Sequence, residues 1–124
     1  MSKKILIVDD EPNIVISLEF LMKREGFQVS VAGDGEAALE QVAAQKPDIV
    51  LLDVMMPKKN GYEVCQLIRA NPEWQDMKII MITAKGRDTE MAKGLAMGAD
   101  AYMTKPFSTK DLVANVKKML GLAL

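Results

Sequence analysis

The chain has 124 residues, 49% of them hydrophobic and 27% charged, and a net charge of −1 at pH 7. These values predict one soluble folded domain spanning residues 1–124, and the small net charge argues against direct binding of nucleic acid or of an anionic membrane. The chain contains no histidine, which excludes an imidazole as base, metal ligand or phosphocarrier. It contains one cysteine, Cys65, so it cannot form an internal disulfide.

Short apolar runs alternate with amphipathic segments along the chain. A short uninterrupted apolar run is typical of a strand buried on both faces, and apolar residues three or four apart are typical of a helix. The predicted strands are 5–8, 29–32, 49–53, 79–82 and 101–104. The first predicted helix begins at Pro12 and ends before Gly26. Three more are predicted over residues 36–44, 62–70 and 89–97, and a last helix is predicted to follow an N-cap at Ser108. The first apolar run is too short for a signal peptide or a membrane span, so we expect a cytoplasmic protein.

Five strands alternating with five helices predict an α/β fold in which right-handed crossovers make the sheet parallel. Five such units in 124 residues fit a doubly wound, flavodoxin-like sheet with strand order 2-1-3-4-5. This order places the first and third strands side by side at the point where ligands bind in such sheets. The residues that would meet at this edge are Asp9, Asp10, Asp53, Thr83 and Lys105.

The predicted edge carries three carboxylates, and their mutual repulsion favours a bound cation among them. Because the chain offers only oxygen ligands, the expected ion is magnesium with several waters. Lys105 would add a positive charge and Thr83 a hydroxyl donor. Around one exposed carboxylate these groups form a site for a phosphoryl dianion, with Asp53 as the nucleophile and an acyl phosphate as the product.

Each of these residues also has an ordinary structural interpretation. Asp9 and Asp10 could cap the next helix, and the other three could be plain strand-end or surface residues. Their shared edge is what favours a functional site. The segment 33–38 matches a dinucleotide fingerprint in its letters, but it follows the second strand and its acidic residues would face a pyrophosphate, so it predicts a tight turn.

Five motifs occur in a fixed order over essentially the whole chain. They are Val8–Pro12, Leu51–Pro57 with Asn60 and Gly61, Ile82–Ala84, Gly98–Tyr102 and Thr104–Phe107. In this combination the chain resembles the receiver domain of bacterial two-component response regulators, which have the CheY-like fold. The resemblance implies that Asp53 accepts a phosphoryl group from a phosphohistidine on a sensor histidine kinase or a phosphotransfer protein.

The resemblance also implies a division of roles within the site. The implied Mg²⁺ ligands are Asp10, Asp53 and the backbone carbonyl of Met55, with Asp9 acting largely through water, and the implied phosphoryl contacts are Thr83 and Lys105, whose bond to Pro106 would be cis. Two positions in this family tune the lifetime of the phosphoryl group. Here they are Met55 and Lys85, neither of which can orient an attacking water, so we expect slow self-dephosphorylation.

The implied switch joins Thr83 to Tyr102. Phosphorylation would draw Thr83 toward the new oxygens, Tyr102 would turn inward, and the surface made by the helix 89–97, the strand 101–104 and the last helix would change shape. That surface would contact a downstream effector protein or an attached output domain, or form a phosphorylation-dependent homodimer. Ala101 stands where DNA-binding members commonly carry an acidic residue, which counts against the dimer.

Two other functions remain open at this point. A haloacid-dehalogenase-like phosphohydrolase would need a second Asp two residues after the nucleophile, where this chain has Met55. A flavin-binding module would need a Ser/Thr/Gly-rich loop after the first strand, where this chain has Asp-Asp-Glu-Pro. We therefore expect no enzyme activity beyond the domain's own phosphorylation and dephosphorylation. The sequence leaves open whether the chain is a stand-alone regulator or the front of a longer transcription factor.

Overall fold

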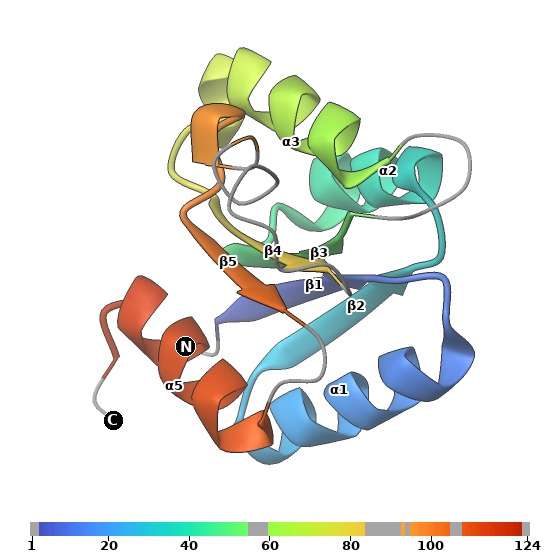
Figure 1. The fold of residues 1–124 in the computed structure, drawn as a ribbon, viewed down its shortest axis with the longest axis vertical. Helices are drawn as coiled ribbons and strands as arrows, with labels where there is room; N and C mark the ends of the chain where they lie inside the picture. The colour runs from blue at the N-terminus through green and yellow to red at the C-terminus, as the bar shows by residue number, and fades with distance from the viewer. Residues whose placement is uncertain (1–2, 55–59, 84–92, 94, 105–107, 123–124) are drawn as a thin grey trace.

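The computed structural model describes residues 3–54, 60–83, 93, 95–104 and 108–122. Within them, strands and helices alternate along the chain (Figure 1). The elements are β1 (Lys4–Val8), α1 (Pro12–Arg24), β2 (Gln28–Ala32), α2 (Gly35–Gln45), β3 (Ile49–Asp53), α3 (Gly61–Ala70), the 3-10 turn η1 (Pro72–Trp74), β4 (Lys78–Thr83), β5 (Ala101–Thr104) and α5 (Thr109–Met119). The predicted helix 89–97 lies largely outside the described residues, although residues 93, 95 and 96 have helical backbone.

The described residues form a five-stranded sheet in the order β2-β1-β3-β4-β5, and every neighbouring pair is parallel. The predicted strand order is therefore confirmed. The apolar sequence of β3 explains its central place, because a strand with neighbours on both sides and helices on both faces needs apolar side chains throughout. All residues of β3 are buried, including its last residue, Asp53.

Helices cover both faces of the sheet: α2 and α3 lie on one face, and α1 and α5 lie on the other (Figure 1). Side chains alternate along each strand, so the strands supply two separate core clusters. The cluster under α2 and α3 includes Leu6, Val50, Leu52 and Met81, and the cluster under α1 and α5 includes Ile7, Leu51, Ile80 and Ile82. Because both faces are filled with apolar side chains, functional polar groups are left to the edges of the sheet. Among the described residues, no helix combines the length and the apolar character that crossing a membrane requires.

Local sequence signals account for most helix ends. α1 begins with a proline and is followed by a glycine with φ +93°, a left-handed conformation that suits glycine. Ser108 caps α5 as predicted, since its Oγ accepts the Asp111 N–H at 3.0 Å. Asp34 caps α2 by accepting the Ala37 N–H at 2.8 Å, which agrees with the turn predicted for residues 33–38.

Candidate functional site

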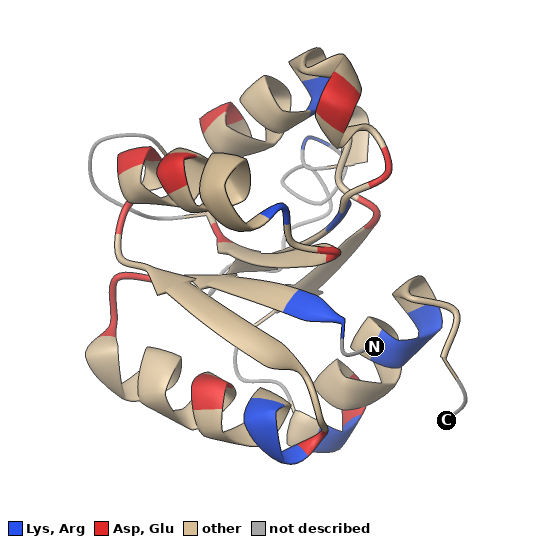
Figure 2. Ribbon diagram, turned by 180° about the vertical axis from the view of Figure 1, so that it is seen from behind, with Lys and Arg blue, Asp and Glu red and all other residues tan. Residues whose placement is uncertain are grey.

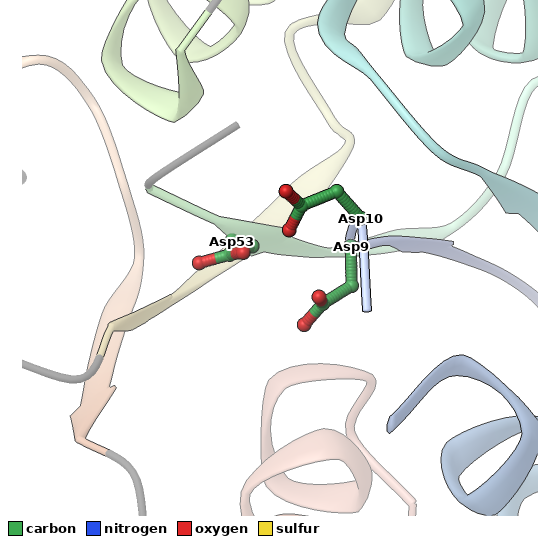
Figure 3. Close-up of side chains that lie close together, drawn as sticks. All are labelled: Asp9, Asp10 and Asp53. Carbon is green, nitrogen blue, oxygen red and sulfur yellow. The ribbon is translucent and has the colours of Figure 1, made fainter. Parts of the chain in front are cut away.

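Three aspartates meet where β1 and β3 end. β1 stops one residue before Asp9, and β3 stops at Asp53. Because the two strands are parallel neighbours in register, Asp9 comes level with Asp53 at the carboxyl edge of the sheet. One carboxylate oxygen from each of Asp9, Asp10 and Asp53 lies within 4.8 Å of the others, and Figure 3 shows the three side chains around one space between the strand ends. The predicted convergence of the three carboxylates is confirmed.

The Asp53 side chain is buried, which contradicts the exposed carboxylate predicted from the sequence. Asp53 is 5% exposed and Asp9 is 4% exposed, whereas Asp10 is exposed to solvent. The reason is that β3 is central: the end of β4 runs alongside Asp53, and the start of α3 packs against its backbone. A pocket of about 280 Å³ beside the cluster is lined by Asp9, Asp10 and apolar residues of α1 and β2.

Asp9 is held by the backbone around it. Its Oδ1 accepts the Glu11 N–H at 2.9 Å, and its own N–H donates to the Ala32 carbonyl at 3.1 Å. Asp9 therefore does not cap α1, whose N-cap is Glu11 with no side-chain cap bond, but one of its oxygens stabilises the turn that leads into the helix. The same bond keeps the carboxylate beside the other two aspartates.

The start of α3 fits closely against the end of β3. The Gly61 N–H donates to the Val54 carbonyl at 2.9 Å, and a Cβ at position 61 would lie 2.5 Å from the Asp53 carbonyl oxygen. Asn60 and Glu63 form a capping box, in which each side chain accepts the backbone N–H of the other residue, at 3.0 and 3.4 Å. Position 61 therefore needs glycine for close approach to the backbone of Asp53. Sequence reasoning missed this role, although Asn followed three residues later by Glu is a recognisable helix-start signal.

The remaining predicted site residues lie on β4, on β5 and outside the described residues. Thr83 ends β4 one residue beyond the register partner of Asp53 and is 2% exposed, so it lies at the same edge of the sheet. Tyr102 lies in β5 opposite Met81 and is half-buried against the core under α2 and α3. The predictions for Met55, Lys85, Lys105 and Pro106 concern residues outside the described ranges and stay predictions.

Charge is distributed unevenly between the two edges of the sheet. Figure 2 shows acidic residues in the loop between β1 and α1 and at the start of α2, and basic residues at the start of β1 and toward the ends of α1 and α5. The basic residues in the last turns of these two helices are Lys23, Arg24, Lys117 and Lys118. Within the described ranges, negative charge thus prevails at the carboxyl edge, and an anion would be repelled there unless a cation were bound.

The donor set fits a hard divalent cation. Carboxylate oxygens are ligands that Mg²⁺ prefers, and two neighbouring ligands on one ion lie roughly 3 to 4 Å apart because each bond is about 2.1 Å long. The oxygens of Asp9, Asp10 and Asp53 lie within 4.8 Å of one another, so small side-chain movements would bring them to one ion. Three protein oxygens leave coordination positions for water and for a phosphoryl oxygen.

Comparison with known families agrees with this geometry. The family model described as the response regulator receiver domain matches residues 5–117. The chain belongs to this family. The resemblance inferred from the five sequence motifs is therefore confirmed, and the three aspartates lie within the matched part of the receiver domain.

Solved structures with the same fold include response regulators. A candidate response regulator from Chloroflexus aurantiacus is 35% identical, with 98% of this chain and 99% of that chain covered and a TM-score of 0.93. A CheY-like receiver domain protein from Methanospirillum hungatei is 30% identical, with coverage of 98% and 95% and a TM-score of 0.91. The BeF3-activated N-terminal receiver domain of RstA from Klebsiella pneumoniae is 32% identical, with coverage of 95% and 98% and a TM-score of 0.89. These similarities establish a CheY-like fold for the receiver domain.

Proposed function

We propose that this receiver domain, a single unit over residues 1–124, is the phosphoacceptor of a two-component signalling system. In this proposal Asp53 accepts a phosphoryl group from a phosphohistidine on a sensor histidine kinase or a phosphotransfer protein. The observation that carries the proposal is the meeting of three carboxylates within 4.8 Å at the carboxyl edge of the sheet. Membership of the receiver domain family supports it.

Asp53 is better placed than its two neighbours to be the nucleophile. One oxygen of Asp9 accepts the Glu11 N–H, and Asp10 is exposed, so Asp10 is held less firmly than the buried pair. Asp53 ends the central strand, is buried, and has β4 and the start of α3 packed against it. A carboxylate held in one place needs little reorganisation to attack, which favours Asp53.

The proposed reaction is a transfer between two nucleophiles. A carboxylate oxygen of Asp53 attacks the phosphorus, the phosphorus–nitrogen bond to the donor imidazole breaks, and the product is an aspartyl acyl phosphate. The imidazole keeps the electron pair of that bond and takes a proton from solvent. Because the acidic edge opposes the approach of a phosphoryl dianion, we expect the reaction to require Mg²⁺.

Asp9, Asp10 and Asp53 would hold this ion, with the backbone carbonyl of Met55 as a further ligand. Bound Mg²⁺ supplies positive charge to the phosphoryl oxygens. Lys105 is proposed as a second positive contact. Met55 and Lys105 lie outside the described residues, and the support for their roles is the match of their motifs to the family pattern.

Thr83 and Tyr102 are proposed to carry the state of Asp53 to the surface. Thr83 ends the neighbouring strand just beyond the register partner of Asp53, which would let its hydroxyl donate to a phosphoryl oxygen. Tyr102 is half-buried, so a change in packing beside β4 would alter its burial. Phosphorylation would shift the populations of the two packings. The surface of β5 and α5 would then contact an effector protein, an attached output domain or a second copy of the chain.

The proposal includes no activity on external substrates, because the domain would catalyse only its own phosphorylation and a slow dephosphorylation. We also propose a cytoplasmic location, since a single cysteine suits a reducing compartment. The rival phosphohydrolase function predicts turnover of small phosphoesters. An assay with p-nitrophenyl phosphate and Mg²⁺ separates the two, and sustained turnover would favour the phosphohydrolase.

Incubation with acetyl phosphate and Mg²⁺, followed by intact mass measurement, tests the proposal. The wild type should gain one phosphoryl group, and Asp53→Asn should gain none because an amide is a poor nucleophile. Asp34→Asn is a matched control, since it removes a carboxylate from the same edge while asparagine still caps α2. Labelling of Asp53→Asn at the wild-type level would refute the proposal, and EDTA should abolish labelling of the wild type.

A further inference from the structure

One side of α3 contacts the segment that leads into β5. We call this segment the joint, and it comprises Lys93, which contacts Tyr62, and residues 95–100, which lie beside α3 in Figure 1. The α3 residues that contact the joint are Tyr62, Cys65 and Arg69. Their spacing of three and four residues puts them on one face of the helix. The joint is therefore attached to α3 at three points along its length.

The attachment at Arg69 is strong. The Arg69 guanidinium donates to the carbonyl of Gly98 at 2.8 Å and to that of Met77 at 2.6 Å, and it pairs with the Asp100 carboxylate at 2.7 Å. The same carboxylate accepts the Ile79 N–H at 2.8 Å. Gly98 has φ +107°, and a Cβ there would lie 2.6 Å from the Cγ of Arg69. Several charge-assisted bonds and a close fit hold this end of the joint to α3.

The attachment at Lys93 is weak by comparison. The Lys93 Nζ lies 4.6 Å from the centroid of the Tyr62 ring, and Lys93 is exposed. A cation–π contact at an exposed site changes an equilibrium by about two- to five-fold and is lost beyond roughly 6 Å. An added separation of about 1.4 Å would therefore break it.

The weak attachment is also the one nearer to the phosphoacceptor. Tyr62 directly follows Gly61, whose N–H donates to Val54 and whose backbone packs against the Asp53 carbonyl. A movement of the end of β3 would therefore be passed to the first turn of α3. Arg69 lies two helical turns further along α3, away from the contact that Gly61 makes with the end of β3.

We propose that the contact between Lys93 and Tyr62 is a latch and that the bonds made by Arg69 are the pivot of the joint. Phosphorylation of Asp53 opens the latch, and the joint turns about the pivot. The trigger, by which we mean opening of the latch by phosphorylation of Asp53, rests on the proposed function. The latch itself is a contact of the unphosphorylated protein. The arrangement gives the receiver domain a second route from its acidic cluster to the surface, through α3 as well as through β4 and β5.

Amide hydrogen exchange in the unphosphorylated protein tests the latch. The Met97 N–H donates to the Lys93 carbonyl at 3.0 Å and reports on the latch end. The Asp100 N–H donates to the Ile79 carbonyl at 2.8 Å and reports on the pivot end. Lys93→Ala should speed exchange at Met97 about two- to five-fold and leave Asp100 unchanged. Alanine favours helix, so faster exchange would not come from lower helix propensity. No acceleration, or equal acceleration at both amides, would overturn the latch.

Binding of beryllofluoride in the presence of Mg²⁺ tests the trigger. Beryllofluoride takes the place of a phosphoryl group on a carboxylate, and the similar RstA receiver domain is BeF3-activated. If occupancy at Asp53 opens the latch, Lys93→Ala should bind beryllofluoride about two- to five-fold more tightly than the wild type. Removal of a positive charge by itself weakens anion binding, so the direction of the change separates the latch from a charge effect.

Two variants serve as controls for both measurements. Lys93→Arg keeps a cation above the ring and should behave as the wild type. Lys118→Ala removes an exposed positive charge from the far end of α5 and should not tighten binding. Absence of beryllofluoride binding by the wild type would refute the proposed function. Wild-type binding with no tightening in Lys93→Ala would refute the opening of the latch and leave the proposed function standing.

Discussion

Two aspartates stand at opposite ends of the central strand, and only one of them lies in the acidic cluster. Asp48 precedes β3 and joins it to its neighbours: its Oδ2 accepts the Lys4 N–H at 2.8 Å, and its carbonyl accepts the Lys78 N–H at 3.0 Å. Asp53 ends the same strand and lies beside two further carboxylates. The same side chain on the same strand is thus structural at the amino edge and a candidate nucleophile at the carboxyl edge.

The difference shows that the neighbours of a carboxylate decide its role. At the amino edge, the Lys4 N–H of β1 donates to the Asp48 carboxylate and the Lys78 N–H of β4 donates to its carbonyl, so the carboxylate charge serves a structural bond. At the carboxyl edge, β1 delivers two more acidic residues to Asp53, and their repulsion makes a place for a cation. Substitutions of Asp48 and Asp53 should therefore differ in their effect on phosphorylation. Their effects on the unfolding free energy without divalent metal should have opposite signs.

The largest expected difference is in phosphorylation. Asp53→Asn should abolish labelling by acetyl phosphate, whereas Asp48→Asn should be labelled at a rate close to that of the wild type. An asparagine oxygen at position 48 can still accept the Lys4 N–H, so the strand keeps its place. Intact mass spectrometry over time gives both rates. Loss of labelling in a folded Asp48→Asn variant would show that the two ends are not independent.

The next largest effect should come from two glycines at the carboxyl edge. A Cβ at position 61 would lie 2.5 Å from the Asp53 carbonyl oxygen and 2.8 Å from the Cα of Val54, whereas nothing lies within 4 Å of a Cβ at position 33. Gly61→Ala should therefore lower the free energy of unfolding by about 3 kcal/mol, and Gly33→Ala should change it by less than about 1 kcal/mol. Urea unfolding of the two variants checks this, and equal losses would contradict the close fit of α3 on β3.

The position of the aspartates could be predicted from the sequence because local rules govern it. Uninterrupted apolar runs mark the strands, and right-handed crossovers make them parallel. Asp9 and Asp53 directly follow such runs, so their meeting at one edge follows from the strand order. The burial of Asp53 could not be predicted in this way. It depends on how α3 and the end of β4 pack around β3, and those elements come later in the chain.

The pivot of the joint also could not be predicted from the sequence. Arg69 meets Gly98 and Asp100 across separations of 29 and 31 residues. The motif that contains Gly98 and Asp100 contributes to the family resemblance, but nothing in its letters says that an arginine of α3 is its partner. Long-range polar contacts of this kind depend on tertiary packing, whereas strand and helix signals are local.

Cys65 is a buried thiol whose surroundings differ from those of Asp53, the proposed nucleophile. Burial raises the pKa of the Cys65 thiol from 9.0 to about 11, while the charge of Arg69 opposes the rise and that of Asp100 adds to it. The thiol donates to the Met97 carbonyl at 3.4 Å. Cys65 therefore stays protonated and unreactive at neutral pH.

The raised pKa predicts a loss of stability at high pH. The unfolded thiol loses its proton near pH 9, whereas the folded thiol keeps its proton up to about pH 11, so rising pH favours the unfolded state within this window. Relative to Cys65→Ala, the wild type should lose about 2 kcal/mol of unfolding free energy between these two pH values and nothing below them. Urea unfolding of both proteins across this range provides the test. Parallel pH dependences would show that burial does not suppress ionisation of the thiol.

The smallest expected effect concerns stability in the absence of divalent metal. Removing one of three neighbouring charges relieves repulsion, so Asp53→Asn should raise the unfolding free energy in EDTA by about 1 kcal/mol. Asp48→Asn should lower it by a similar amount, because a neutral acceptor makes a weaker bond to the Lys4 N–H.

Addition of Mg²⁺ should then reduce the advantage of Asp53→Asn. The unfolding free energy of the wild type should rise once the free Mg²⁺ concentration exceeds the dissociation constant of the Mg²⁺ complex. The variant has one charged ligand fewer, so its unfolding free energy should rise less. If Asp53→Asn is instead less stable than the wild type in EDTA, favourable contacts of the buried carboxylate outweigh its repulsion. Both aspartates would then stabilise the fold, and the two ends of β3 would differ only in whether the phosphodonor can reach the carboxylate.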